Sequence, residues 1–356
     1  MSTAEPEETL VDPTTGAEVI NALIDRLHAH YVFPVVAEHI GTELRQQLAT
    51  GTYASAPTAQ IFCTDLTHTL QTVGHDKHLE VRYSAEAHPP ATDGPSGTDS
   101  VAEVVAWREA YREEARLHNY GIARVERLPG NIGYLDLRGF EDPAVGAETA
   151  VAAMTLLAHT SALIVDLRQN GGGWPEMVAL LTTFLFDAEI VHLDSLYWRQ
   201  GEKTQQFWTL PYVPGSRFGG KKPVYVLTSN RTFSGAEEFT YNLQQLKRAT
   251  IIGETTGGGA NPGDWFALTP HFAVFIPTGR AINPISQDNW EGKGVAPDIA
   301  VPAEEAFDVA VVAALKAVSA ELSTTSTGPL AQLSTEVREA LAQMESKHQN
   351  LLGVSE

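Results

Sequence analysis

The chain has 356 residues, of which 43% are hydrophobic, and a net charge of -20 from 24 basic and 44 acidic side chains. This length and apolar content suit one large domain with a smaller one. The acidity disfavours nucleic acid and anionic membrane as partners, because nothing offsets phosphate repulsion. The single cysteine, Cys63, excludes an internal disulfide and a thiol metal site.

The N-terminal stretch, residues 1–13, is acidic and is expected to be a disordered tail. It has no apolar segment of the kind found in signal peptides, and no uninterrupted apolar run in the chain is long enough to cross a bilayer. These features predict a cytoplasmic protein.

Apolar residues recur at helical spacing between residues 15 and 72 and predict an N-terminal three-helix subdomain over residues 14–83. The first helix is expected to start at the "TGAE" stretch, residues 15–18, which resembles a capping box. The second is expected over residues 35–48. The third carries the apolar residues Ile61, Phe62, Leu66 and Leu70.

A polar loop rich in proline and glycine and then a helix form an expected linker over residues 84–120. The segment 121–322 predicts an α/β core, because apolar strand-like runs such as 162–166 alternate with helical segments and imply parallel crossovers. Residues 323–356 are expected to be a C-terminal helical extension, with a helix at about 334–348. The fold class is therefore predicted as α/β.

The stretch "TFSGAEEF", residues 232–239, follows an apolar run and opens a predicted helix. Ser234 and Glu237 have the spacing of a capping box, so Ser234 is a helix cap on the simplest interpretation. Ser234 is also placed as a nucleophile would be, since Gly235 would supply one amide to an oxyanion hole. The glycine-rich "DLRQNGGGWP" would supply a second amide, from Gly171 or Gly172. The two interpretations are compatible.

Both glycine-containing loops are expected to leave the carboxyl ends of parallel strands, which is where open α/β sheets place ligands. A phosphate cradle is disfavoured, because the loops lack both the Walker A pattern and the dinucleotide-binding fingerprint. The glycine loops are then either tight turns or an oxyanion hole for acyl transfer, and the residues alone do not force a choice.

Five motifs occur in order: "NIGYLDLRGF", "ALIVDLRQNGGG", "TSNRTFSGAEEF", "IIGETTGGGANPG" and "NWEGKGVAPDI". Over residues 15–320 the chain resembles the tail-specific (C-terminal processing) peptidase superfamily. It is most similar to the branch containing the repeats of interphotoreceptor retinoid-binding protein, with the tricorn core protease as a more distant relative. The resemblance implies an N-terminal helical bundle, a crotonase-like (ClpP-like) α/β core, Ser234 as nucleophile, and an oxyanion hole formed by Gly171, Gly172 and Gly235.

The chain departs from the tail-specific members in two respects. Gly258 stands at the position expected for their general-base lysine, and the span 84–120 is too short for their PDZ domain. A serine–lysine dyad is therefore not expected. Histidine has a suitable intrinsic pKa to accept the serine proton and return it. The resemblance points to His78 in "GHDKHLEV" as the base, with His75 ranked below it.

The third member of the site should orient the imidazole. By resemblance to the tricorn-like branch this is Glu291, and Asp76 is the alternative. The resulting prediction is a serine hydrolase or peptidase that acts on a peptide or small acyl substrate, with no metal or organic cofactor and with possible homo-oligomerisation. The alternative is a catalytically inert module that binds a small apolar ligand.

Overall fold

The computed structural model describes residues 10–53, 58–85, 101–322 and 327–351, so most of the expected acidic tail lies outside the described residues. The chain forms two compact units, each assembled from separated segments. The first unit comprises Met1–Glu109, Ser195–Gln205 and Gly259–Ile282. The second unit comprises Ala110–Asp194, Gln206–Gly258 and Asn283–Glu356.

The first unit packs three helices on a three-stranded antiparallel sheet of order β1-β10-β9. The predicted N-terminal helices are confirmed, and their apolar faces meet Val274 and Ile276 of the sheet in one core. Two of these strands come from far along the chain, so this core depends on residues distant in sequence. The elements are α1 (Pro13–His30), α2 (Pro34–Ala49), α3 (Ala59–Gly74), β1 (Glu80–Tyr83), β9 (Gly263–Thr269) and β10 (Phe272–Pro277).

Helix α1 begins earlier than predicted, so the proposed start at residues 15–18 is wrong. The carboxylate of Asp12 accepts hydrogen bonds from the backbone N–H of Thr14 at 2.9 Å and of Thr15 at 3.1 Å. Pro13 follows as the first helical residue, where its missing N–H leaves no donor unsatisfied. An aspartate cap followed by proline therefore outweighs the capping-box pattern three residues later.

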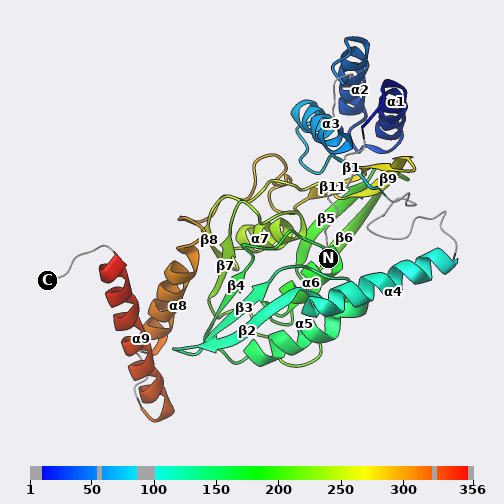
Figure 1. The fold of residues 1–356 in the computed structure, drawn as a ribbon. Helices are drawn as coiled ribbons and strands as arrows, with labels where there is room; N and C mark the ends of the chain where they lie inside the picture. Colours follow the sequence, from blue (N-terminus) through cyan, green and yellow to red (C-terminus); the bar gives the residue numbers. More distant parts are fainter. Residues whose placement is uncertain (1–9, 54–57, 86–100, 323–326, 352–356) are drawn as a thin grey trace, which may run out of the picture. The chain divides into compact units, whose positions relative to one another are not determined.

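The second unit contains a six-stranded sheet of order β12-β8-β7-β4-β3-β2, which is parallel except for β2 (Figure 1). Helices cover both of its faces, which confirms the predicted α/β core. The strands of this sheet are β2 (Ile122–Leu128), β3 (Ile132–Leu137), β4 (Ala162–Asp166), β7 (Val224–Thr228), β8 (Thr250–Gly253) and β12 (Ile299–Ala300). The helices of this unit are α5 (Pro143–Leu157), α6 (Pro175–Thr183), α7 (Gly235–Gln245), α8 (Ala306–Leu322) and α9 (Pro329–Leu351), and α4 (Val101–Leu117) spans the boundary between the units. A further three-stranded sheet has the order β11-β5-β6 and consists of β5 (His192–Trp198), β6 (Lys203–Trp208) and β11 (Gly279–Ile282).

Strand β4 shows how the two faces of the sheet are used. Leu163 and Val165 belong to a core shared with α5, α6 and α7, whereas Ala162 and Ile164 belong to a core shared with α8 and α9. All five residues of the strand are buried, as expected of a parallel strand covered on both sides. Because β3, β4, β7 and β8 are parallel, the loops that follow them leave the sheet at the same edge.

The C-terminal helix α9 packs on α8 and is longer than the predicted helix at 334–348. Val337 of α9 is buried in the same core as Leu315 of α8. The side chain of Glu336 accepts a hydrogen bond from the N–H of Gly130 at 3.0 Å, in the turn between β2 and β3. The extension is thus integrated into the core of the second unit.

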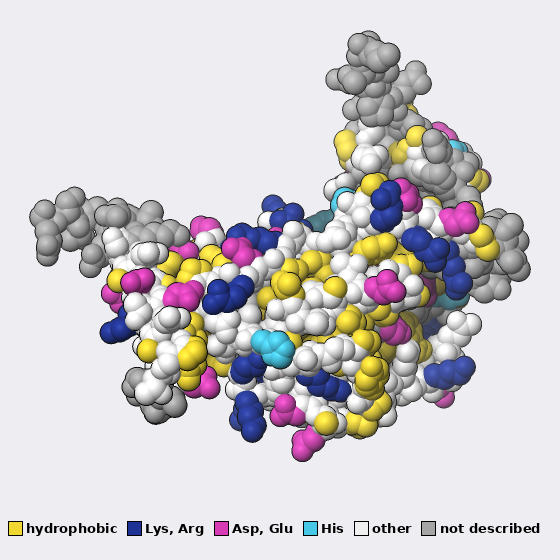
Figure 2. Space-filling view, turned by 90° about the horizontal axis from the view of Figure 1, so that it is seen from below, with side chains coloured by type: hydrophobic (Ala, Val, Ile, Leu, Met, Phe, Trp, Pro, Cys, Tyr) yellow, Lys and Arg dark blue, Asp and Glu magenta, His cyan; other side chains and the backbone are white. Residues whose placement is uncertain are grey.

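The face drawn in Figure 2 carries acidic and basic side chains interspersed with apolar ones, and its basic residues do not merge into one continuous surface. Within the described residues, every helix is too short or too polar to cross a bilayer.

The turn between β2 and β3 provides a test of the packing on α8. Gly130 has φ +77°, and a Cβ there would lie 2.6 Å from Cδ2 of Leu315, whereas Gly328 has φ +67° with open space around it. We expect Gly130→Ala to lower the free energy of unfolding by about 2 kcal/mol and Gly328→Ala by about 1 kcal/mol, since the backbone penalty is shared but the clash is not. Equal losses in denaturant titrations would contradict this packing.

Candidate active site

Ser234 lies in the turn between β7 and α7 and is the N-cap residue of the helix, as predicted. Its backbone has φ 51° and ψ -123°, a conformation that residues with a side chain rarely adopt. Such strain costs about 1–3 kcal/mol and persists only where the surroundings impose it. The helix terminus adds a partial positive charge at this point. A strained strand-to-helix turn is a known way to present a nucleophilic serine.

The glycine loop after β4 lies directly against this turn. A Cβ on Gly172 would lie 2.7 Å from Cβ of Ser234 and 2.8 Å from the amide nitrogen of Gly235. A Cβ on Gly235 would lie 2.8 Å from the carbonyl oxygen of Gly173. Neither position tolerates a side chain, so the structure brings Ser234, Gly172 and Gly235 together. Gly171 is exposed at the tip of the same loop.

Asn170 fixes the conformation of the glycine loop, and sequence reasoning did not single it out. This fully buried side chain accepts a hydrogen bond from the N–H of Gly172 at 2.8 Å and donates one to the carbonyl of Leu137 at 3.0 Å. Its own carbonyl accepts from the N–H of Phe233 at 3.1 Å. The Gly172 amide is therefore engaged within the loop. An asparagine directly before glycines is typical of a turn, and that signal was available in the sequence.

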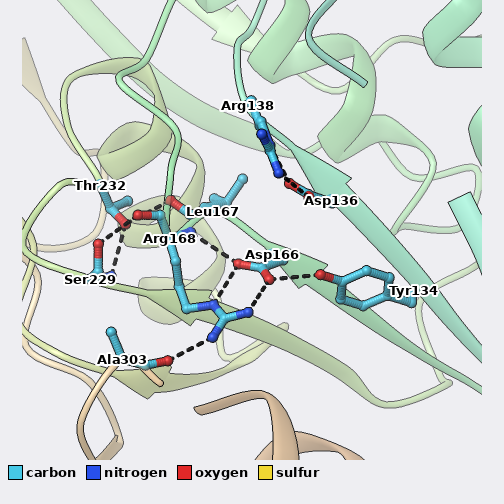
Figure 3. A network of polar contacts seen from close by, with 9 residues as sticks. All are labelled: Tyr134, Asp136, Arg138, Asp166, Leu167, Arg168, Ser229, Thr232 and Ala303. Atoms are coloured by element: carbon cyan, nitrogen blue, oxygen red, sulfur yellow. Dashed lines mark hydrogen bonds and ion pairs between the residues drawn. The ribbon is translucent and has the colours of Figure 1, made fainter. Parts of the chain in front are cut away.

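Two hydroxyl side chains join the loop after β7 to the glycine loop (Figure 3). Ser229 donates to the carbonyl of Arg168 at 2.6 Å, and Thr232 donates to the carbonyl of Leu167 at 2.8 Å. Thr232 also accepts from the N–H of Ser229 at 3.0 Å. These contacts set the spacing between the Ser234 turn and the glycine loop.

Arg168 anchors the start of the glycine loop through Asp166 and the carbonyl of Ala303 (Figure 3). Its guanidinium donates to Asp166 through Nε at 2.9 Å and Nη2 at 2.6 Å, and to the carbonyl of Ala303 at 2.7 Å. Tyr134 donates to the same carboxylate at 2.8 Å, and burial followed by the charge of Asp166 raises the pKa of this phenol. The hydrogen bond to Asp166 raises the pKa of Arg168. The two hydrogen bonds between the guanidinium and the carboxylate of Asp166 hold Arg168 in one orientation.

The carboxylate of Glu237 contacts the Ser234 turn and is fully buried. It accepts hydrogen bonds from the N–H of Ser234 at 3.0 Å, from the N–H of Gly258 at 2.7 Å, and from the hydroxyl of Thr256. Gly258 has φ +87°, and a Cβ there would lie 3.0 Å from the amide nitrogen of Gly294. A lysine at position 258 would therefore be strained.

Glu291 is half-buried and lies in a turn of the second unit, where its N–H donates to the side chain of Asn289 at 3.0 Å. Nearby Lys293 pairs with Asp288 at 2.5 Å. The N–H of Gly292 donates to the carbonyl of Gly258 at 3.0 Å, so the turn that carries Glu291 is attached to the loop that contacts Glu237.

His78 lies in the first unit, in the turn between α3 and β1. Asp76 is buried and accepts from the N–H of His78 at 3.1 Å, from Tyr31 at 3.1 Å and from Asn261 at 2.9 Å. Asp76 therefore fixes the backbone of this turn. The imidazole of His78 stacks on Phe275 with ring centroids 5.8 Å apart.

Burial dominates the protonation of both residues. It lowers the pKa of His78 to about 4 and raises the pKa of Asp76 to about 6, the latter against the hydrogen bonds from Asn261, His78 and Tyr31. His75, the lower-ranked candidate base, is the left-handed cap at the end of α3, with φ 52° and an exposed side chain.

A cavity of 480 Å³ in the second unit opens beside the end of β3. The carbonyl and N–H of the neighbouring Phe140 bond to the N–H of Trp174 at 2.7 Å and to the carbonyl of Gly172 at 2.8 Å, so the cavity adjoins the glycine loop. Its polar lining includes Tyr111, Glu114, His118, Arg138 and Glu141.

Comparisons with known proteins match two segments of the chain to domains of one peptidase family. Residues 131–301 match Peptidase family S41, and residues 14–118 match the N-terminal domain of Peptidase_S41 in eukaryotic IRBP. The chain is 28% identical over 198 residues to carboxyl-terminal-processing peptidase 2, chloroplastic, of Arabidopsis thaliana, covering 52% of this chain and 37% of that protein. It is 28% identical over 180 residues to the carboxy-terminal-processing protease of Bartonella bacilliformis, covering 49% and 40%.

The chain thus spans well under half the length of these curated relatives. Among solved structures, it resembles a putative peptidase from Parabacteroides merdae with a TM-score of 0.53 at 19% identity, covering 82% of this chain and 90% of that one. At this identity the structural match shows a shared fold.

The hydroxyl contacts between the two loops can be tested through stability. We expect Thr232→Val to lower the free energy of unfolding by about 2 kcal/mol, because the buried N–H of Ser229 loses its partner and the carbonyl of Leu167 keeps only the N–H of Asn170. Thr240→Val is the matched control, since Thr240 is equally buried but bonds only back to the carbonyl of Ala236 within α7, and we expect about 1 kcal/mol or less there. Similar losses for both variants in urea titrations would contradict a role for Thr232 in joining the loops.

Proposed function

Because the chain belongs to peptidase family S41, we propose that it is a serine hydrolase that cleaves a peptide or related acyl bond through an acyl-enzyme. The observation that carries the proposal is the placement of Ser234. It occupies a strained turn at the N-terminus of α7, packed against a glycine loop at the carboxyl edge of a parallel sheet. Acyl transfer needs a nucleophile and amide donors close together, and open α/β sheets place their ligands at this edge.

In the proposed reaction, Oγ of Ser234 attacks the acyl carbon as Nε2 or Nδ1 of His78 takes its proton. The N–H of Gly235 and the N–H of Gly171 stabilise the oxyanion, since the N–H of Gly172 is bonded to Asn170. The lack of a side chain at Gly172 lets the glycine loop approach Ser234 closely. The imidazolium returns the proton to the leaving group, which departs as the carbonyl re-forms. Water then attacks the acyl-enzyme by the same route and frees Ser234.

Two observations support histidine in place of lysine as the base. Gly258 has a positive φ and close backbone neighbours, which disfavour a lysine at that position. His78 lies in a turn whose backbone is fixed by the buried Asp76. With Asp76 bound to the backbone of this turn, the proposal assigns the imidazole-orienting role to Glu291.

The substrate is proposed to be a peptide or a small acyl compound. The curated relatives named as carboxyl-terminal-processing enzymes make a peptide the first choice. A cytoplasmic location, homo-oligomerisation and the lack of nucleic-acid and membrane partners stay predictions from the sequence.

The proposal is tested by labelling the protein with a fluorophosphonate probe and counting the labelled fraction by intact mass. We expect wild type to be labelled and Ser234→Ala to be unlabelled. His78→Ala should react at least about a hundredfold more slowly than wild type, because the hydroxyl loses its base. Labelling that persists in Ser234→Ala would refute the assigned nucleophile. A folded wild type that resists labelling would favour an inert module, and apolar ligands would then be screened by thermal shift.

The pH dependence of labelling tests the base. A general base acts when neutral, so the rate should be low below the pKa of His78 and rise to a plateau above it. Since burial lowers that pKa to about 4, we expect the midpoint of the rise near pH 4. A midpoint at or above the ordinary histidine value of about 6.5 would contradict the dominance of burial.

A further inference from the structure

We propose that Glu237 is a positioning residue whose buried carboxylate holds the nucleophile turn in its strained conformation and fastens it to the 256–258 loop. The inference rests on the proposed function, because it concerns how Ser234 is presented for attack. Glu237 does more in this arrangement than complete a helix cap.

The first argument is the burial and bonding of the carboxylate. Glu237 is 0% exposed, and a buried carboxylate is costly unless its oxygens accept hydrogen bonds. Oε2 accepts from the N–H of Ser234, while Oε1 accepts from the N–H of Gly258 and the hydroxyl of Thr256. These three partners are donors, and an ionised carboxylate is an acceptor at every lone pair. Both carboxylate oxygens therefore serve as acceptors in these contacts.

The second argument is the position of the bond to Ser234. A change in the φ of Ser234 rotates the peptide plane that carries its N–H. The hydrogen bond that this N–H donates to Oε2 therefore limits φ. That φ is 51°, which is unfavourable for a serine unless something holds it. A charge-assisted hydrogen bond inside a dry site is strong enough to do so. The side-chain oxygen of Ser234 is thereby directed by a carboxylate that need not touch substrate.

The third argument is where the other oxygen leads. Thr256, which donates to Oε1, accepts from the N–H of Val295 at 2.7 Å, and the carbonyl of Gly258 accepts from the N–H of Gly292 at 3.0 Å. One carboxylate thus joins the turn of the proposed nucleophile to the segment that carries Glu291. Displacing this carboxylate should therefore move both Ser234 and the segment that carries Glu291.

The neighbouring residue offers a matched control. Glu238 lies one position along α7 and is also buried, but burial and the nearby charges of Asp194 and Glu176 raise its pKa well above the ordinary value. Glutamine is a close mimic of the neutral carboxyl group at that position. At position 237, by contrast, the amide NH2 of a glutamine would face a donor on one side or the other.

The experiment measures fluorophosphonate labelling at several probe concentrations, which separates the maximal labelling rate from the half-saturating probe concentration. We expect Glu237→Gln to lower the maximal rate about a hundredfold with little change in half-saturation, because misplacement of the reacting atom by about 1 Å has that effect. Glu238→Gln should label like wild type. Thr256→Val should lower the maximal rate about tenfold, and Thr256→Ser should restore it, because serine keeps the hydroxyl that bonds Oε1.

Folding of each variant is checked by near-ultraviolet circular dichroism. A folded Glu237→Gln that labels at the wild-type rate, while Ser234→Ala does not label, would overturn the positioning role and leave the proposed function standing. Absence of labelling in folded wild type would remove both. Should Glu237→Gln fail to fold, the Thr256 pair decides: equal rates for the valine and serine variants would overturn the inference.

Discussion

The organisation of the candidate site depends on one close backbone contact, that of the glycine loop after β4 with the Ser234 turn after β7. An added Cβ at Gly172 or Gly235 would overlap the opposite loop at less than 3 Å, so both positions require glycine. Such an approach leaves each loop few alternative conformations. The strained φ of Ser234 is then held from two sides, by the packing of the two loops and by the hydrogen bond from its N–H to Glu237.

The parallel sheet is what makes this contact possible. Because β4 and β7 are adjacent and parallel, their following loops begin side by side at one edge. Polar side chains then adjust the fit between them. Ser229 and Thr232 join the two loops from one side, Asn170 from within the glycine loop, and Arg168 ties its start to Asp166 and to the carbonyl of Ala303. Buried polar networks of this kind specify one arrangement when every member is paired.

The sequence indicated the parts of this structure that carry a local signal. The buried strand at 162–166, the helix cap at Ser234 and the glycine loop could be recognised from composition and spacing alone. The contribution of residues 259–282 to the first unit could not, because strand partners distant in sequence leave no periodic pattern. The roles of Asn170 and Glu237 could not be predicted for a related reason. The sequence pattern of a turn asparagine or a capping box is the same whether or not the side chain also bonds a distant segment. The start of α1 was misassigned because two local signals, Asp12 and "TGAE", competed.

The protonation of His78 explains why the proposed site requires a third member. Burial keeps the imidazole neutral near pH 7, as a base must be, but the same burial disfavours the imidazolium that forms when the base accepts a proton. A carboxylate near the ring would favour that cation and so lower the barrier to proton transfer. Asp76 is poorly suited to this role, because its oxygens accept from the backbone of His78 and from Tyr31 and Asn261, and burial raises its own pKa to about 6. A separate carboxylate, held on a turn that is tied through Gly258 to Glu237, would supply the charge without disturbing the turn that carries His78.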